Sequence, residues 1–285
     1  MLHILLPVHN RVQTTVHFLN ALLRQQSGPD YCLWVVDDGC TDETVIRVEQ
    51  LLPPARRRIL SGSGSLWWAG ALQLAYNALS ALPLPDDDAV LICNDDMTFG
   101  PEFLQSGMQL LQRYPNTAIQ AEGHDAASGI VDHGAVADLL RLSFRDAGDG
   151  SRVNCLSTRG LLLSGRTFRQ SGGFKPQYLP HYLSDYEFTL RLHRSGIALL
   201  TDPSFRATVH LELTGHERYN CSSVQLCWSQ ALSNRAKYNP RHWTAFVLLA
   251  CPPWITPWQI ARIWLRFGVA LLAAALVPRR ASSRG

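Results

Sequence analysis

Short apolar runs alternate with segments of helical periodicity along the first 122 residues of the chain. The apolar runs predict buried strands at residues 2–8, 31–36, 57–60, 89–93 and 117–122. The segments between them carry apolar residues at helical spacing and predict helices at about residues 14–25, 43–51, 66–79 and 101–113. This alternation is typical of an α/β fold with a Rossmann-like, mostly parallel central sheet flanked by helices.

The remainder of the chain is less regular. Residues 123–150 are rich in Gly, Asp and Ala and show weak periodicity, which predicts loops and hairpins around a pocket. A helix is predicted at residues 184–194, short strands at 197–200 and 208–213, and a helix at about 222–238. We therefore divide the chain into one domain, residues 1–240, and an apolar C-terminal helical appendage, residues 241–285.

The appendage raises the question of a membrane. Residues 258–277 would be long enough, as one helix, to cross roughly 30 Å of hydrocarbon. Arg262 and Arg266 lie in its first half, and Pro252, Pro253 and Pro257 interrupt the approach to it. These features favour two short helices lying on a membrane surface. A helical hairpin packed on the protein's own core is the alternative.

Composition narrows the classes of protein. A chain of 285 residues with 46% hydrophobic content can bury a sizeable core. A net charge of +3, without interleaved basic and aromatic residues, argues against nucleic acid as a partner. The seven cysteines show no CxxC spacing, and the apolar N-terminus lacks a basic leader. We expect reduced thiols and a cytoplasmic location, with peripheral attachment to the inner face of the cytoplasmic membrane.

Polar residues follow three of the predicted strands directly. His9 and Asn10 follow the first strand, Asp37 and Asp38 end the second, and Asn94, Asp95 and Asp96 follow the fourth. In an open parallel sheet, ligands gather at the carboxyl ends of the strands, so these tips should face one crevice. Adjacent carboxylates after a buried strand repel each other, which indicates a compensating cation such as a hard divalent metal. A solvated Asp-rich turn is the alternative.

Five motifs occur in order at these and later positions: residues 6–10 (LPVHN), 36–42 (VDDGCTD), 94–96 (NDD), 172–174 (GGF) and 184–191 (SDYEFTLR). Together they resemble the motifs of the family 2 glycosyltransferases, which are inverting enzymes of the GT-A fold. Residues 66–71 (LWWAGA) also resemble a tract of rhamnosyltransferase-like members. The resemblance implies a UDP-, dTDP- or GDP-sugar donor, Mn²⁺ or Mg²⁺, and a glycan or lipid-linked acceptor of polysaccharide biosynthesis.

The resemblance also implies roles for particular residues. Asp185 would be the general base, Glu187 would lie in the acceptor region, and Asp96 would hold the metal together with His210. The residues expected to bind the donor nucleotide are Pro7, His9, Asn10, Asp37, Asp38, Trp67, Trp68, Asn94 and Asp95. Within this set, the Asp38 carboxylate would accept a hydrogen bond from the base.

Each role has a simpler alternative. Asp185 suits a helix N-cap, Trp67 and Trp68 suit core packing, and His210 suits a hydrogen-bonded strand residue. The chain also has Asn94 and Ser184 where the family usually has acids, which leaves open a GT-A-like carbohydrate- or membrane-binding protein with weakened catalysis. A sugar nucleotidyltransferase is a further alternative, although the expected Gly-, Arg- and Lys-containing loop does not follow the first strand.

Overall fold

The computed structural model describes residues 1–125, 127–129, 131–148, 152–209 and 224–276. A nine-stranded sheet forms the centre of this described part, in the order β3-β2-β1-β4-β10-β6-β11-β5, with β7 paired to β6. The strands at one side are β1 (Leu2–Val8), β2 (Tyr31–Asp37), β3 (Arg57–Ser61) and β4 (Ala89–Ile92), and all four are parallel. The predicted α/β fold with a mostly parallel sheet is therefore confirmed.

The other side of the sheet mixes directions. Strand β10 (Leu161–Ser164) runs antiparallel to β4 and to β6 (Thr117–Asp125). Strand β11 (Ala198–Val209) runs parallel to β6, and β5 (Met97–Phe99) closes the edge antiparallel to β11, while the short β7 (Val131–Asp132) pairs with β6. Because β10 is reversed, the residues before it lie at the same edge of the sheet as the residues after β1, β2 and β4.

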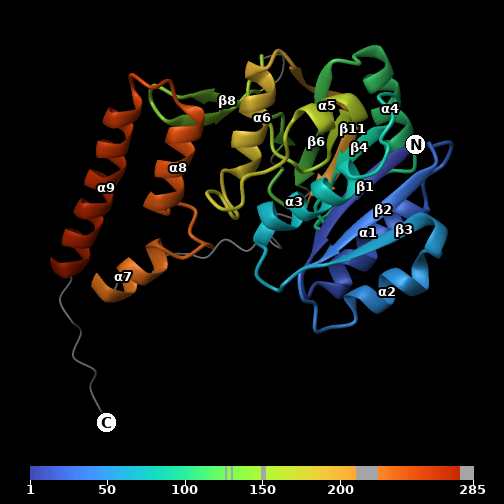
Figure 1. Ribbon diagram of the computed structural model, residues 1–285, viewed down its shortest axis with the longest axis horizontal. Helices are drawn as coiled ribbons and strands as arrows, with labels where there is room; N and C mark the ends of the chain where they lie inside the picture. The colour runs from blue at the N-terminus through green and yellow to red at the C-terminus, as the bar shows by residue number, and fades with distance from the viewer. Residues whose placement is uncertain (126, 130, 149–151, 210–223, 277–285) are drawn as a thin grey trace, which may run out of the picture.

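Helices cover both faces of the sheet (Figure 1). Apolar residues of α1 (Val12–Leu23) and α4 (Phe103–Arg113) form one core with alternate residues of β1 and β2. Those of α3 (Trp67–Ser80), α5 (Gly165–Gln170) and α6 (Ser184–Arg194) form a second core with the opposite face. Helix α2 (Thr44–Leu51) and the 3₁₀ turn Pro54–Arg56 connect β2 to β3. The alternation of side-chain direction along each strand explains the two cores.

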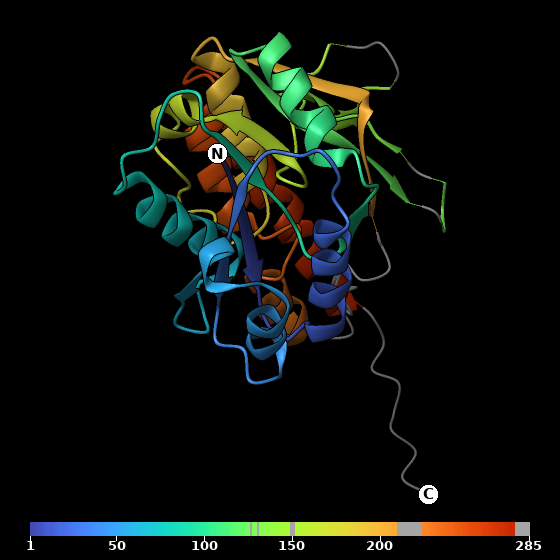
Figure 2. The ribbon, with the colours of Figure 1, turned by 90° about the vertical axis from the view of Figure 1, so that its right-hand side faces the viewer.

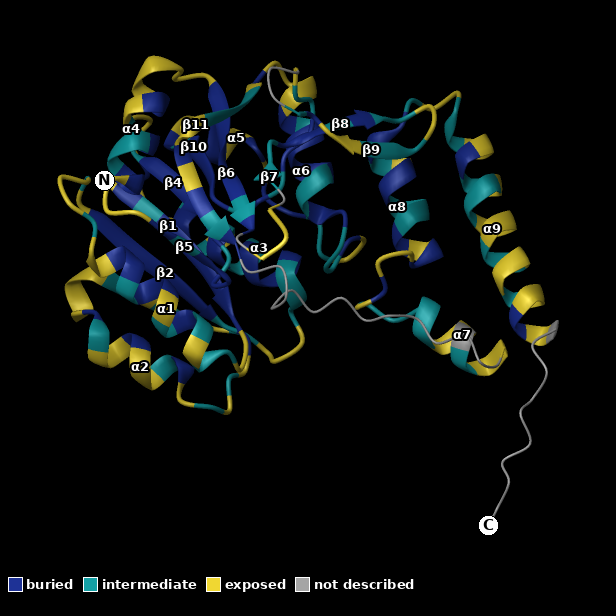
Figure 3. Ribbon diagram, turned by 180° about the vertical axis from the view of Figure 1, so that it is seen from behind, coloured by how far each residue is buried: buried dark blue, intermediate teal, exposed yellow. Residues whose placement is uncertain are grey.

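A third core joins the C-terminal helices to the domain. It consists of the hairpin β8 (Ala135–Asp138) and β9 (Ser143–Asp146), together with α6 and α8 (Pro240–Ala250). Helix α8 lies between α6 and α9 (Thr256–Leu276), which is the outermost element, and α7 (Val224–Ala231) packs against α9 (Figures 1 and 3). Gln259 of α9 donates from Nε2 to the carbonyls of Leu139 and Leu140 at 3.0 and 2.6 Å.

Several predicted elements differ from the observed ones. The predicted strand 197–200 and the first two residues of the predicted strand 208–213 belong to one long strand, β11, with a register shift between Asp202 and Arg206; residues 210–213 lie outside the described residues. Helix α7 ends at Ala231, before the predicted end at residue 238, while residues 222–223 of that prediction lie outside the described residues, and β5, β10 and α5 were not predicted. The hairpin expected between residues 123 and 150 is present as β8 and β9. The prolines do divide the C-terminal segment into two helices, but α9 has 21 residues and is not short.

Candidate active site

The polar strand tips do meet at one edge of the sheet. Val8 of β1 pairs with Asp37 of β2, and Leu5 pairs with Ile92 of β4, so the residues that follow these strands are neighbours. Leu161 of β10 pairs with Ile92, which brings Arg159, two residues earlier, to the same edge. This edge of the sheet therefore combines the acidic or polar residues that end or follow β1, β2 and β4 with Arg159, which precedes the reversed strand β10.

Asp38 organises the loop that leads into α3. Its Oδ1 accepts from the backbone N–H of Gly64 at 2.8 Å, and its Oδ2 accepts from those of Leu66 and Trp67 at 2.9 and 3.2 Å. The side chain is buried, and these bonds occupy much of the accepting capacity of both oxygens. This geometry favours a loop-ordering role for Asp38 over the expected hydrogen bond to a nucleobase.

Residues after β1 order the turn that follows β2. His9 Nδ1 lies 2.6 Å from the carbonyl of Asp38, and Asn10 Oδ1 accepts from the N–H of Thr41 at 2.7 Å. Asp37 Oδ1 accepts from Cys40 N–H at 2.7 Å. Pro7 lies inside β1, opposite Val36. Of the residues expected to line the nucleotide pocket, His9 and Asn10 are exposed at the edge, whereas Pro7 is buried behind them.

The pair Asp95–Asp96 is buried beside arginines. Arg11 Nη1 lies 3.4 Å from Asp95 Oδ1, and Thr15 donates from Oγ1 to Asp95 Oδ2 at 3.2 Å. Burial raises the pKa of Asp95 to about 6, against the opposing effect of Arg11. Asp96 Oδ1 lies 3.8 Å from Arg159 Nε, and neither atom has a hydrogen-bond partner among the residues that the structure describes. The predicted compensating cation is thus supplied, in part, by two arginines.

A divalent metal would also fit this edge. Asn94 Oδ1 and Asp96 Oδ1 are both buried acceptors without a hydrogen-bond partner, and oxygen ligands of this kind suit Mg²⁺ or Mn²⁺. No group of three or more His, Cys, Asp or Glu residues arranged to hold a metal occurs within the described residues. His210, expected as a further ligand, lies outside the described residues. The described fit therefore rests on Asn94 and Asp96.

Asp185 lies in the first turn of α6, facing the same arginine. Its Oδ1 accepts from the N–H of Tyr186 at 2.9 Å, and α6 is preceded by Leu183, which has φ +69°. Burial raises the pKa of Asp185 to about 6; Arg159 acts to lower it and Asp132 to raise it. The N-cap position belongs to Leu183, so the N-cap alternative for Asp185 is wrong. Arg159 thus lies between Asp96 and Asp185.

Sequence reasoning missed Arg159, Arg11 and Asp132. Arg159 lies in the segment before an unpredicted strand, and nothing local marks it as a partner of residues 63 and 26 positions away. One signal was available: an arginine and a glycine, Arg159–Gly160, directly precede the apolar run that forms β10. Gly160 has φ +71°, and a Cβ there would lie 2.8 Å from the Ala121 Cβ, so only glycine suits this turn.

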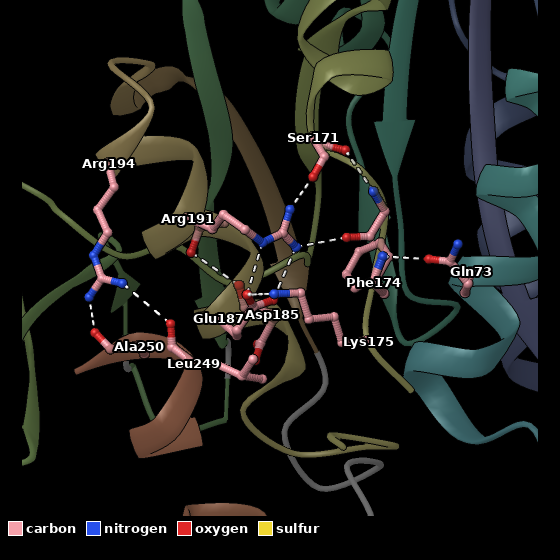
Figure 4. A network of polar contacts seen from close by, with 12 residues as sticks. Gln73, Ser171, Phe174, Lys175, Asp185, Glu187, Arg191, Arg194, Leu249 and Ala250 are labelled. Atoms are coloured by element: carbon pink, nitrogen blue, oxygen red, sulfur yellow. Dashed lines mark hydrogen bonds and ion pairs between the residues drawn. The ribbon is translucent and has the colours of Figure 1, made fainter. Parts of the chain in front are cut away.

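Glu187 is held in a buried ion-pair network rather than facing open space (Figure 4). Arg191 donates to both of its carboxylate oxygens, at 2.8 and 3.0 Å, and Lys175 Nζ lies 3.2 Å from Oε1. Arg191 also donates to the carbonyls of Ser171 and Gly173. The network fixes the GGF turn, residues 172–174, against α6, next to Asp185. This placement favours a supporting role for Glu187 over direct contact with an acceptor.

The two tryptophans differ in their surroundings. Trp68 is partly buried against the core of α3 and donates from Nε1 to Thr158 Oγ1 at 3.2 Å. The Trp67 ring lies 6.1 Å from the His181 ring and borders a cavity. The backbone of Trp67 has a φ of +59°, which is uncommon for residues other than glycine. Asn10 and Leu183 also have positive φ angles. Strained backbone of this kind gathers at functional sites.

The nine-stranded sheet with helices on both faces is a GT-A fold. Residues 3–131 match the family model described as Glycosyl transferase family 2. The resemblance to this family is confirmed for those residues, which are a little less than half of the chain, and the rhamnosyltransferase-like subtype stays a prediction. A comparison with curated proteins gave no match.

Solved structures show the same fold at low identity. The chain is similar to the mannosyltransferase PcManGT from Pyrobaculum calidifontis in complex with GDP-Man and Mn2+, with a TM-score of 0.59 and 16% identity over 96% of this chain and 72% of that one. It is similar to S. aureus TarS 1-349 in complex with UDP-GlcNAc, with a TM-score of 0.58 and 15% identity over 96% and 83%. It is also similar to GalNAc-T7 with UDP, GalNAc and Mn2+, with a TM-score of 0.60 and 10% identity over 98% of this chain and 58% of that one.

Proposed function

We propose that the protein is an inverting glycosyltransferase that transfers a sugar from a UDP, dTDP or GDP donor to a hydroxyl of a glycan or lipid-linked acceptor. The observation that carries this proposal is the convergence of Asp96, Arg159 and Asp185 at the strand edge of a GT-A fold. Two proteins of similar fold, PcManGT in complex with GDP-Man and TarS 1-349 in complex with UDP-GlcNAc, support a nucleotide-sugar donor. The LWWAGA tract, residues 66–71, supports a rhamnosyltransferase-like hexosyl donor and a place in polysaccharide synthesis.

Asp185 is the proposed general base. Its carboxylate removes the proton from the acceptor hydroxyl as that oxygen forms a bond to the anomeric carbon. The bond from this carbon to the diphosphate breaks on the opposite face, so the configuration inverts. A pKa of about 6 leaves the carboxylate mostly ionised at neutral pH while keeping it more basic than an exposed aspartate.

Asp96 is the proposed metal ligand, with Asn94 and His210 as further donors. When bound, Mn²⁺ or Mg²⁺ would neutralise charge on the leaving diphosphate. Arg11 and Arg159 already lie within 4.0 Å of Asp96 oxygens and contribute positive charge at the same place. The structures of PcManGT and GalNAc-T7, which have a similar fold and contain Mn2+, support this proposal.

Asp96→Asn tests the donor and metal site. The amide keeps the volume but loses the charge, so we expect Mn²⁺-dependent binding of UDP-, dTDP- or GDP-sugar to weaken by at least 10-fold in calorimetry. Asp138→Asn, the same change at a partly exposed residue of the β8–β9 hairpin, is the matched control. Wild-type protein that binds a donor but neither hydrolyses nor transfers it would favour the alternative, a binding protein with weakened catalysis. Consumption of a nucleoside triphosphate would favour a sugar nucleotidyltransferase.

We further propose that the enzyme works on a membrane surface, through the outward face of α9. Trp258, Leu265, Val269 and Leu272 recur at helical spacing on this face and are 57–70% exposed. The opposite face packs on α7 and α8; the Phe267 ring, for example, lies 5.4 Å from that of Trp228. Residues 256–275 are, within the described chain, long and apolar enough to span a bilayer by length and composition. Packing of α9 along α8 favours a helix lying on the surface.

A further inference from the structure

A second cavity lies beside the donor edge, on the other side of Trp67. It has a volume of about 820 Å³ and is bordered by α3, residues 176–180 and α8. This volume suits a ligand of several rings. The residues used in the argument below line it: Trp67, Asn77, Gln177, Tyr178, Asn234 and His242.

The chemistry of the lining differs from that of the donor edge. Among the described residues, no carboxylate lines this cavity and Arg241 is its one charged lining residue, whereas Asp96 and Asp185 lie near Arg159 at the donor edge. The guanidinium N–H groups of Arg241 can donate to hydroxyl groups. Side-chain amides of Asn77, Gln177 and Asn234 alternate with the aromatic rings of Trp67 and Tyr178. Amides can both donate to and accept from hydroxyl groups, and aromatic rings offer flat apolar surfaces to the faces of sugar rings.

His242 supplies an independent sign of a ligand. The side chain lines the cavity and is only 8% exposed, yet its Nδ1 has no hydrogen-bond partner. Burial, assisted by Arg241, lowers the pKa of His242, so the ring is neutral at pH 7. A neutral imidazole has one donor and one acceptor nitrogen, which complement a hydroxyl group. A buried polar atom without a partner is costly. Because Nδ1 has almost no accessible surface, the ring would have to turn toward the cavity for a ligand hydroxyl to become its partner.

The cavity is connected to the donor edge through two short segments. The backbone N–H of Trp67 donates to Asp38, while the rest of Trp67 lines the cavity. Pro180, which also lines it, accepts from the N–H of Ala69 at 2.9 Å and lies five residues before Asp185. A molecule in the cavity would therefore lie beside the segment that leads into α6, the helix that carries the proposed base.

We propose that this cavity binds an uncharged saccharide, the part of the acceptor glycan next to the hydroxyl that reacts. That the bound saccharide is part of the acceptor rests on the proposed function. That the cavity binds a saccharide is inferred independently, from the cavity, its lining residues and His242.

The test is a saturation-transfer NMR titration of the full chain with chitotriose, maltotriose, cellotriose and, as an acidic probe, trigalacturonate. We expect at least one of the neutral trisaccharides to bind. His242→Phe keeps the ring but removes the nitrogens, and Tyr178→Ala removes an exposed ring, so each should weaken binding by at least 10-fold. Tyr114→Ala removes an exposed tyrosine directly after α4, which does not line the cavity, and should leave the affinity unchanged.

Binding of none of the neutral probes, binding of trigalacturonate alone, or equal binding by all three variants would overturn the inference. Donor binding is measured in parallel with UDP-, dTDP- and GDP-sugars. If wild-type protein binds a trisaccharide but none of the sugar donors, the result would count against the proposed function alone. Donor binding without any trisaccharide binding would count against the inference alone.

Discussion

At the residue scale, the decisive feature is a carboxylate that folding makes harder to ionise. Asp185 has its pKa raised to about 6, mainly by burial. An aspartate raised in this way is stabilising when protonated, and its contribution is lost as pH rises from about 4 through about 6. At neutral pH the ionised group therefore costs stability. A group kept charged at such a cost is typical of a functional site.

We predict that Asp185→Asn reduces transfer by about 10²- to 10⁴-fold while donor affinity stays within about threefold of wild type. Because the base must be ionised, wild-type kcat should fall as pH drops below about 6. The pH–rate profile and donor calorimetry measure both effects. The melting temperature of the variant at pH 7 should be equal or higher, since a buried charge is removed. A fully active variant would show that another group is the base.

Arg159 should set the position of that pH limb. Its guanidinium lowers the pKa of Asp185, so Arg159→Gln should move the acid limb of the kcat profile to higher pH, while Arg159→Lys should keep it near the wild-type position. The control is Arg152→Gln, because Arg152 is an arginine that does not lie at this edge. An unshifted limb in Arg159→Gln would mean that the arginine has no electrostatic effect on the base.

Candidate site residues could be found in the sequence only where a motif contains them, and the roles proposed for them stay predictions. Asp96 and Asp185 were located because each lies in a family motif, and the structure places them on either side of Arg159. The partner, Arg159, was not located because no sequence rule pairs residues across a reversed strand. Asp38 was located, but its bonds to the 64–67 loop depend on a backbone conformation that includes φ +59° at Trp67. Local propensity does not predict such a conformation.

At the scale of elements, two ion pairs of the same type at the same spacing have different surroundings. Glu187 and Arg191 in α6 are 3% and 27% exposed, whereas Glu43 and Arg47 at α2 are 63% and 47% exposed. The first pair also fastens the GGF turn to α6 through the carbonyls of Ser171 and Gly173 (Figure 4). The contrast makes α6 the element most sensitive to loss of one charge.

We predict that Arg191→Met destabilises the fold by about 3–5 kcal/mol, because it leaves the Glu187 carboxylate buried beside Lys175 alone. Arg47→Met, the matched control, should cost about 0–1 kcal/mol. Urea unfolding followed by circular dichroism measures both. Similar values for the two variants would contradict a structural role for the α6 network.

Elements were predicted best where strand and helix alternate. The first four strands share one direction, and each is joined to the next by a crossover helix, so the pattern of the sequence specifies them. Strand β10 has only four residues, Leu161–Ser164, too few to show a period, and its reversed direction depends on pairing with β4 and β6. The same holds for β5, which has three residues and whose pairing to β11 spans more than 100 positions.

At the scale of the whole molecule, charge and apolar surface are unevenly distributed. Residues 219–285 contain eight Lys or Arg and no Asp or Glu, while residues 1–218 contain 18 basic and 23 acidic residues. Helix α9 lies at the edge of the described part, on the side away from α1 and α2 (Figures 1 and 3), and the C-terminal helices lie behind the sheet in the view of Figure 2. An anionic bilayer would attract the basic end and repel the acidic domain, which would orient the enzyme.

The last prediction concerns this orientation. The chain should sediment with vesicles of phosphatidylcholine and 30% phosphatidylglycerol, and less with phosphatidylcholine alone. Leu265 and Leu272 are exposed on the same face of α9, so changing both to Asp should not disturb the core. Each buried leucine contributes about 1.5–3 kcal/mol, so the double variant should bind roughly 100-fold more weakly. Leu82→Asp, an exposed leucine after α3, is the control. Equal sedimentation of the double variant and wild type would assign the outward face of α9 to another partner. The cavity is bordered by α3 and α8, and α8 packs on α9, so a protein bound to the bilayer through α9 would hold the cavity one helix away from the lipid surface.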